Sequence, residues 1–409
     1  MYSISLLTIC FSEILTKENL LFLSHRIPYP PNKGDKLRSF HLLEHLKQSH
    51  VVHMGTFVDD REDWKHAQSA KQLGLGSVHY APIKPLMARV GSLTGLASGE
   101  ALSVSYYRNR ALRNWVNETV ARHNIRKVVA FSSPMAQYVR HLKEVTRLID
   151  FVDLDSDKWI QYAKQASWPM RWIYNREGRA LLDFERRIAH EFDASFFVSK
   201  PEADLFSKKT GLEDKVHFFR NGVNSETFDP AQAMRNPYTS SRPKIVFTGA
   251  MDYLPNIDAV TWFSREVFPI LKARGSDAEF YIVGSNPSQS VKNLETRDIH
   301  VTGRVERVQP YIAYADLVVA PLRMARGVQN KILEALSMEK PVVASKQAIA
   351  GIECPTPTAV GCLCATTATD FAHKVGAVLS SPFRNQAGRQ WVLAHYNWQR
   401  NLSRLDAFL

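Results

Sequence analysis

The segment ARGVQNKILEALSMEKPVVAS, residues 325–345, combines the residue types that a bound diphosphate requires. The apolar run at residues 317–322 precedes it and is typical of a buried strand, and the following pattern predicts a helix over residues 327–338. The first N–H groups of a helix have no partner within the helix, and the helix dipole adds positive charge at the same end. Because both features complement phosphate oxygens, we expect a diphosphate at the start of this helix.

The residues around this helix start supply the rest of a nucleotide site. Arg326 and Lys331 would neutralise the phosphates, and the backbone of Gly327 and Val328 would donate hydrogen bonds to them. Glu334 follows within two turns, where its carboxylate can accept from both ribose hydroxyls, as acidic residues do in nucleotide sites. The alternative is an ordinary amphipathic helix with a surface glutamate.

A second loop with suitable residues, HRIPYPPNKGDKLRSFHLL, follows an apolar strand predicted at residues 20–24. Gly34 lets the backbone approach a ligand closely, and Asp35 and Arg38 lie in the first turn of the next helix. We expect this loop to contact phosphate or a second substrate. A capped helix start with a tight turn explains the same residues equally well.

Three aspartates, Asp153, Asp155 and Asp157, lie at the end of a strand predicted at residues 147–155. A carboxylate at such a place can orient a hydroxyl group or act as a general base, and we assign this role to Asp155. Binding of a divalent cation by the Asp-x-Asp pattern is a second interpretation. Capping of the next helix by Asp155 or Ser156 is a third.

The elements that must position these residues alternate between strand and helix, which predicts an α/β fold with parallel sheets. The alternation occurs twice, on either side of a polar, Pro- and Ser-rich linker at residues 221–243. The predicted strands are residues 20–24, 51–58, 77–83, 128–133, 147–155 and 194–199, then 244–250, 279–285, 299–305, 317–322 and 340–345. The predicted helices are residues 37–46, 64–73, 174–192 and one from 201, then 257–274, 308–315 and 327–338, with a helical tail at 384–409.

Composition narrows the classes of partner. A chain of 409 residues exceeds one hydrophobic core, and its net charge of +12 favours anionic partners. No zinc finger or aromatic-basic RNA-binding motif is visible, so we do not expect nucleic acid as a partner.

The four cysteines lack the spacing of a metal site, and we interpret them as free thiols. The first 16 residues lack the basic start of a signal peptide and are too short to span a membrane, which favours a location in the cytoplasm. We interpret them as an extra segment before the first strand.

The carboxy-terminal half resembles the GT-B glycosyltransferases of family 4. The resemblance identifies Glu334 as the second acid of that family's Glu-x7-Glu signature, whereas Arg326 stands where the first acid would be. Further similar strings are FFRNGVNSETFDP, VFTGAMDYLPNIDAVTWF, YIVGSNP and VTGRVE. They imply donor contacts from Gly249, Asn256, Gly284, Arg304 and Val305, with Arg304 as a substitute for the Arg and Lys that typical members carry after the strand at residues 244–250.

The amino-terminal half resembles the sugar transferases associated with exosortase/PEP-CTERM exopolysaccharide gene clusters. The strings HRIPYPPNKGDKLRSFHLL, DFVDLDSDKW and NREGRALLDFERRIAHEFDASFFVS carry this resemblance. It implies a GT-B fold, with two Rossmann-like domains facing each other across a cleft. We expect an amino-terminal acceptor domain at residues 1–225, with residues 390–409 packing back on it, and a donor domain at residues 240–389.

The function that the resemblance implies is retaining transfer of a sugar from a nucleoside-diphosphate sugar to a glycan or lipid-linked acceptor. Arg326, Lys331 and the helix start would stabilise the leaving diphosphate, without a cofactor or a required metal, and Gly34 and Asp35 would cover the acceptor side. A nucleotide-sugar epimerase of the same fold and a non-catalytic sugar-nucleotide-binding assembly protein are the alternatives.

A basic helix at residues 171–187 lies beside Trp168, Trp172 and Tyr174. Such a helix can make peripheral contact with an anionic membrane, where a lipid-linked acceptor would be found. A solvated helix face over core aromatics is the alternative.

Overall fold

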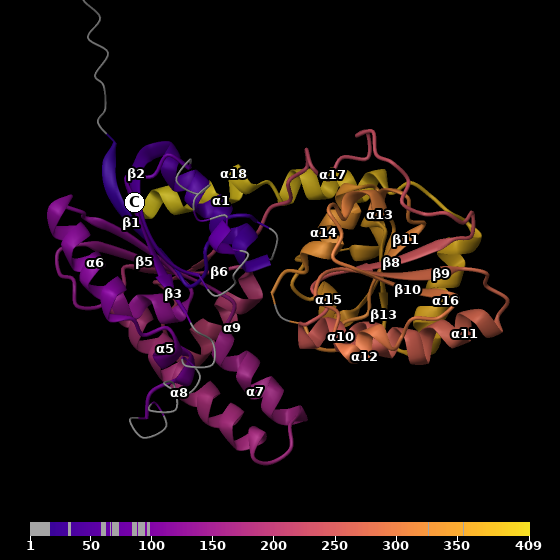
Figure 1. Ribbon diagram of the computed structural model, residues 1–409, viewed down its shortest axis with the longest axis horizontal. Coiled ribbons are helices and arrows are strands. Elements are labelled where there is room, and N and C mark those ends of the chain that lie inside the picture. The colour runs from indigo at the N-terminus through magenta and orange to yellow at the C-terminus, as the bar shows by residue number, and fades with distance from the viewer. Residues whose placement is uncertain are drawn as a thin grey trace, which may run out of the picture.

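The structure, a computed structural model, describes residues 17–31, 34–58, 63–65, 67, 73–83, 88, 95, 99–325, 327–354 and 356–409, with the backbone alone at 34 and 35. It has two domains, each built on a parallel sheet covered by helices (Figure 1). No helix in the described ranges is long and apolar enough to cross a bilayer. The predicted α/β fold with two Rossmann-like domains is confirmed.

The amino-terminal sheet has the strand order β3-β2-β1-β4-β5-β6-β7 within the described residues, and all its pairs are parallel. Its elements are β1 (Glu18–Ser24), α1 (Gly34–Ser49), β2 (His50–Val58), β3 (Ser77–Pro82), α5 (Leu102–Tyr106), α6 (Arg110–Arg122), β4 (Lys127–Phe131), η2 (Ser133–Tyr138), β5 (Thr146–Val152), α7 (Asp155–Gln165), α8 (Met170–Glu191), β6 (Ala194–Phe197), α9 (Lys200–Thr210) and β7 (Val216–Phe218). The direction of winding reverses between β1 and β4, and open α/β sheets bind ligands at the carboxyl ends of the strands beside such a point.

The carboxy-terminal sheet has the order β10-β9-β8-β11-β12-β13 among the residues described, again with parallel pairs. Its elements are β8 (Lys244–Thr248), α10 (Leu254–Trp262), the π-helical turn η3 (Phe263–Val267), α11 (Phe268–Ala273), β9 (Glu279–Val283), α12 (Gln289–Lys292), β10 (Ile299–Gly303), α13 (Gln309–Ala313), β11 (Leu317–Ala320), α14 (Asn330–Ser337), β12 (Val342–Ser345), α15 (Lys346–Ile349), η4 (Pro357–Val360), β13 (Cys362–Ala365), α16 (Ala368–Ser380) and α17 (Gln386–His395). Here the winding reverses between β8 and β11.

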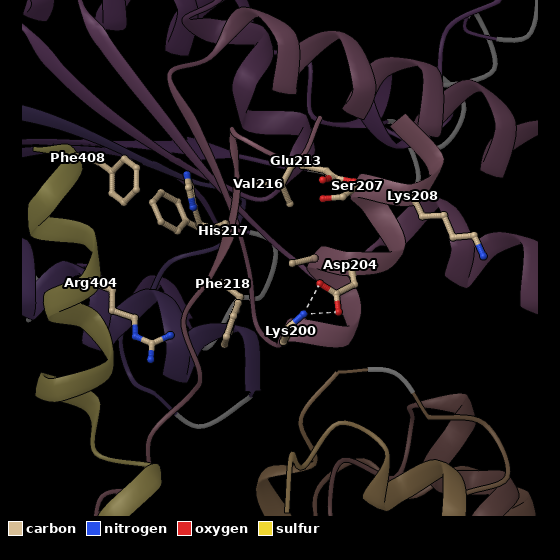
Figure 2. Close-up of a pocket in the computed structure, with 12 residues that line it drawn as sticks. Lys200, Asp204, Ser207, Lys208, Glu213, Val216, His217, Phe218, Arg404 and Phe408 are labelled. Carbon is tan, nitrogen blue, oxygen red and sulfur yellow. Dashed lines mark hydrogen bonds and ion pairs between the residues drawn. The ribbon is translucent and has the colours of Figure 1, made fainter. Parts of the chain in front are cut away.

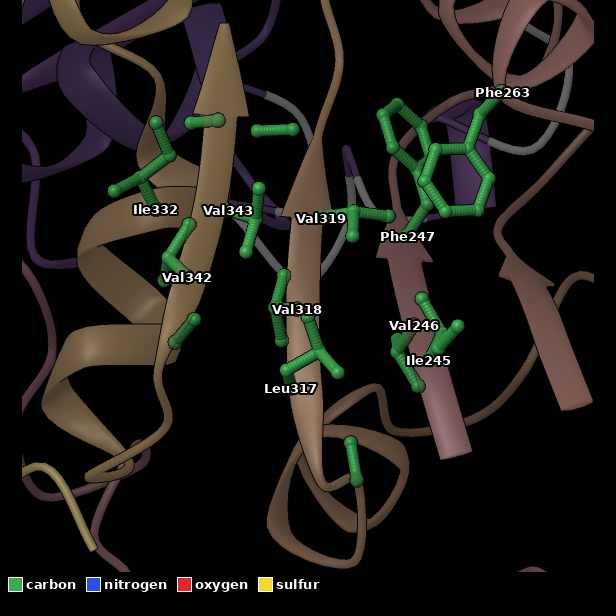
Figure 3. Packing of buried hydrophobic residues seen from close by; sticks show 14 of the residues in the cluster. Ile245, Val246, Phe247, Phe263, Leu317, Val318, Val319, Ile332, Val342 and Val343 are labelled. Atoms are coloured by element: carbon green, nitrogen blue, oxygen red, sulfur yellow. The ribbon is translucent and has the colours of Figure 1, made fainter. Parts of the chain in front are cut away.

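The core of the carboxy-terminal domain shows why its short apolar runs become central strands. Val246, Val318 and Val342 lie on the neighbouring strands β8, β11 and β12, and Ile332 of α14 packs beside them (Figure 3). All four side chains are at most 1% exposed. Burying such a side chain contributes about 1.5–3 kcal/mol, so this packing holds α14 firmly against the sheet.

The last helices connect the two domains. Val392 of α17 belongs to the carboxy-terminal core, whereas Leu402 of α18 (Trp398–Leu402) and Leu405 of η5 (Ser403–Phe408) belong to an amino-terminal core cluster. Trp398 stacks on His41 of α1 with ring centroids 4.4 Å apart. Figure 1 shows this segment running from one domain to the other, where the chain ends near β1 and β2.

Several elements differ from the sequence prediction. The helices α6 and α7 and the short strands β7 and β13 were not expected, and α14 begins at Asn330 rather than at Gly327. Gly327 has φ +62°, a left-handed conformation that cannot continue a right-handed helix, so it lies in the loop before α14. The predicted extra segment at residues 1–16 lies outside the described residues.

Candidate functional site

The predicted diphosphate site lies at the point where the winding of the carboxy-terminal sheet reverses. Gly249 follows β8 directly, and the loop after β11 leads into α14. The strands β8 and β11 are neighbours, so both loops leave the same edge of the sheet. This edge is where open α/β sheets bind their ligands.

The start of α14 presents the positive end of a helix, as an anion site requires. Its N-cap, Gln329, makes no side-chain capping hydrogen bond to the helix backbone. The positive end of the helix therefore lies at Gln329 and Asn330, three residues later than the sequence indicated, because Gly327 belongs to the preceding loop. Val328 is partly buried against the domain core, and Arg326 lies outside the described residues.

Lys331 is held in place by its neighbours. Its Nζ donates to Oδ1 of Asn256 at 2.7 Å and lies 4.1 Å from the centre of the Phe247 ring. Asn256 in turn donates from Nδ2 to the carbonyl oxygen of Ala250 at 2.9 Å, which fixes its amide. Asn256 therefore positions Lys331, and burial lowers the pKa of the Lys331 amine to about 7.

Glu334 lies one turn after Lys331 on the same face of α14. Burial raises the pKa of its carboxyl to about 7, and the nearby Lys331 acts in the opposite direction. The pair thus changes charge near neutral pH, as is common among groups that contact ligands.

Two glycine loops form the floor beside Lys331. A Cβ atom at Gly284 would collide with the carbonyl oxygen of Gly249, and one at Gly249 would lie 3.3 Å from Nζ of Lys331. The two loops therefore pack directly on each other after β8 and β9, which only a residue without a side chain at Gly284 permits. Farther along this edge, Arg304 after β10 is exposed and Val305 packs on the core.

The facing part of the amino-terminal domain carries a cluster of carboxylates that the sequence showed only in part. Glu202 of α9 accepts from the backbone N–H of Leu154 at 2.9 Å, which places it beside Asp153. Burial and the charge of Asp153 raise the pKa of Glu202 to about 7, and burial also raises the pKa of Asp153. The strands β5 and β6 are neighbours, which brings these two acids together, but the sequence alone does not reveal the strand order.

Asp155 is the first residue of α7 and accepts from Nζ of Lys158 at 2.8 Å. Neither Asp155 nor Ser156 caps the helix, because the N-cap is Leu154 and no side-chain cap bond forms. Burial alone would lower the pKa of Lys158, but Asp155 and Asp153 raise it well above its usual value. Within the described ranges, no group of three or more His, Cys, Asp or Glu residues has a geometry that could hold a metal ion.

The two faces meet at Gly327. The buried Oδ1 of Asp153 has no hydrogen-bond partner in the described structure, and a Cβ atom at Gly327 would collide with it. Nearby, Nδ2 of Asn221 donates to Oδ1 of Asn330 at 3.2 Å. Glu353 of the carboxy-terminal domain accepts from the backbone N–H of Lys200 at 2.7 Å and pairs with Arg220. The start of α14 therefore lies where both domains touch.

The prediction that Arg38 contacts phosphate or a second substrate is wrong. The Arg38 side chain is 0% exposed and pairs with Asp150 at 2.7 Å, while its Nη1 donates to Phe219 and Asn221. With its donors used inside the domain, Arg38 holds α1, β5 and the linker together and cannot contact an acceptor. Gly34 opens α1 as expected, but the side chain of Asp35 lies outside the described residues.

The pocket drawn in Figure 2 lies on the amino-terminal domain and borders the domain contact through Lys200. It has a volume of about 700 Å³ and lies between α9, the edge strand β7 and η5. Lys200 and Asp204 form an ion pair in its wall at 2.7 Å, and His217, Phe218 and Phe408 supply aromatic rings. It contains none of the residues that the sequence predicted.

Comparisons with known proteins agree with this geometry. Residues 242–381 match the family described as glycosyl transferases group 1, and no curated protein matches the chain. Sucrose-phosphate synthase from Thermosynechococcus elongatus has a TM-score of 0.70 at 16% identity, covering 96% of this chain and 98% of that chain. Anabaena HepE, solved with UDP, has a TM-score of 0.65 at 14% identity, covering 96% and 100%. WaaG, a glycosyltransferase involved in lipopolysaccharide biosynthesis, has a TM-score of 0.59 at 13% identity, covering 95% and 96%.

The family match falls on the domain that carries α14, Lys331 and Glu334, and the structural likeness covers nearly the whole chain. The paired Rossmann-like domains have the GT-B arrangement of HepE and WaaG. Residues 242–381 thus form a domain of the glycosyl transferases group 1 family, and the chain as a whole has the GT-B fold.

Proposed function

We propose that the protein transfers a sugar from a nucleoside-diphosphate sugar, with retention at the anomeric carbon, to a glycan or lipid-linked acceptor. The observation that carries the proposal is the meeting of the α14 start, Lys331 and Asp153 at the contact between the domains. The positive helix end and Lys331 would stabilise the leaving diphosphate. HepE, a neighbour in fold, was solved with UDP and with UDP-glucose, which supports a diphosphate donor of this kind.

We assign the other site residues their roles from where they lie relative to α14. Glu334 would accept from the ribose hydroxyls, the loops at Gly249 and Gly284 would receive the diphosphate and sugar, and Arg304 and Val305 would lie near the base. Asp155, with Asp153, would orient the acceptor hydroxyl. We propose that no metal is required, because Lys331 and the helix end supply positive charge at the leaving group.

We also propose a place for the reaction. The resemblance of the amino-terminal half to exopolysaccharide transferases favours a role in exopolysaccharide biosynthesis. We propose that the protein works in the cytoplasm, at the inner face of the membrane, where a lipid-linked saccharide acceptor is available.

A thermal-shift screen with UDP, GDP and their sugars tests the ribose assignment. We expect one diphosphate to raise the melting temperature and Glu334→Ala to abolish that increase while the protein stays folded. Glu266→Ala, which removes an exposed acid in the same domain, is the matched control and should respond like wild type. Undiminished stabilisation of Glu334→Ala would refute the assignment. Conversion of the nucleotide sugar without any acceptor would instead indicate an epimerase.

A further inference from the structure

The helices α7 and α8 form a hairpin that projects from the amino-terminal domain, at the end away from α18 (Figure 1). Its tip, which we define as residues Lys164 to Trp172, exposes large apolar side chains. Trp168 is 83% exposed, Trp172 58% and Met170 40%. These side chains lie close together in sequence at one turn, so they form one patch.

The exposure of this tip does not result from poor packing of the hairpin. Trp159 of α7 packs against Tyr162 and against Tyr174 of α8, with ring centroids 5.9 and 5.4 Å apart. The apolar side of each helix is therefore already used between the two helices. The tip aromatics are additional to this packing, and folding of the hairpin does not account for them.

The charged side chains of the tip are all basic. Lys164, Arg171 and Arg179 are exposed, and Arg179 lies two turns beyond Trp172 on the same side of α8. No Asp or Glu occurs between Lys164 and Arg176. Basic side chains around tryptophan are the combination that anionic membrane surfaces attract, because indole rings favour the membrane–water interface.

We infer that the hairpin tip docks on an anionic phospholipid bilayer. A protein partner fits less well, since three side chains offer on the order of 400 Å², about half of what a stable protein interface buries on each side. The eleven residues of α7 span roughly 16 Å, so docking would hold Asp155 at about that distance from the tip. The inference rests on the proposed function only in the claim that the acceptor is lipid-linked.

Co-sedimentation of the full chain with sucrose-loaded vesicles tests the inference. We expect binding to vesicles that contain phosphatidylglycerol, little binding to pure phosphatidylcholine, and weakening by added salt. Trp168→Ser with Trp172→Ser should reduce binding by about tenfold or more, and Lys164→Glu with Arg171→Glu should remove the lipid preference. Phe383→Ser, which removes an exposed aromatic ring from the carboxy-terminal domain, should bind like wild type.

Failure of wild type to bind either vesicle, or equal binding by the double tryptophan variant, would overturn the inference. A second measurement separates this failure from failure of the proposed function. The double tryptophan variant should keep the wild-type melting temperature and the wild-type response to nucleotide, because the substituted side chains are exposed and lie outside α14 and the loops after β8 and β9. Loss of the nucleotide response in that variant would show that the hairpin acts on the donor site and would also overturn the inference.

Discussion

The two domain faces that meet at Gly327 have opposite chemistry. The carboxy-terminal face consists of glycine loops, the N-terminal end of α14 and Lys331, with Glu334 one turn away. The amino-terminal face consists of Asp153, Asp155 and Glu202 around a single lysine, Lys158. One face is suited to an anion, and the other to a hydroxyl group or a positive charge.

In a glycosyl transfer, the two faces would therefore act on different groups. A leaving diphosphate gains negative charge in the transition state, while the transferred sugar gains positive charge. Carboxylates opposite the phosphate side would stabilise the sugar and orient the acceptor, and they would contribute little to nucleotide affinity. Variants on the two faces should therefore have different kinetic effects.

The largest effect is expected from Gly284→Val. The added side chain must displace the Gly249 backbone, which closes the diphosphate loops. Loss of the hydrogen bonds that this loop would donate to the charged phosphates costs up to about 3 kcal/mol, which corresponds to a nucleotide affinity about 100-fold lower. Calorimetric titration measures it. Gly376→Ala, which has no neighbour closer than 3.9 Å, is the control, and an unchanged affinity of Gly284→Val would remove the loops from the site.

Asp153→Asn tests the opposite face. We expect kcat to fall by about 100-fold, because a carboxylate that acts on the reacting groups typically contributes this much, while the nucleotide affinity stays unchanged. Steady-state kinetics together with titration separate the two effects. Asp204→Asn, at an ion pair on α9, should leave kcat unchanged. An equal loss of nucleotide affinity in Asp153→Asn would contradict the division of work.

The pKa of Lys331 predicts a smaller, pH-dependent effect. Its pKa is lowered to about 7, so its positive charge is present below pH 7 and is lost as the pH rises above 7. Nucleotide affinity should therefore fall between about pH 7 and 9, by about tenfold in total, because the phosphates lose a cation. Lys331→Arg stays charged and should bind with little pH dependence. The exposed Lys346→Arg should behave like wild type, and a persistent pH dependence in Lys331→Arg would assign it to another group.

The sequence brings the residues of the carboxy-terminal face together more readily than those of the amino-terminal face, for a physical reason. Lys331, Glu334 and the turn at Gly327 lie within eight residues of each other, so local pattern places them together. Asp153 and Glu202 are far apart in sequence and meet only because β5 and β6 are neighbours.

Two errors show where local reasoning fails. The helix start shifted to Asn330 because Gly327 adopts a left-handed conformation, and a glycine in the sequence is compatible with either backbone region. Arg38 looked like a site residue, but its partners Asp150, Phe219 and Asn221 come from distant parts of the chain and bury it.

The central claim is that the α14 start and Lys331 bind the paired phosphates of a nucleotide. Its most direct test is calorimetric titration of Lys331→Met with the nucleoside diphosphate that stabilises the wild type and with the corresponding nucleoside. We expect the diphosphate to bind about 10- to 100-fold more weakly, since a hydrogen bond between charged groups contributes about 1.5–3 kcal/mol, and the nucleoside to bind as before. Wild-type affinity for the diphosphate, or an equal loss for the nucleoside, would contradict the claim.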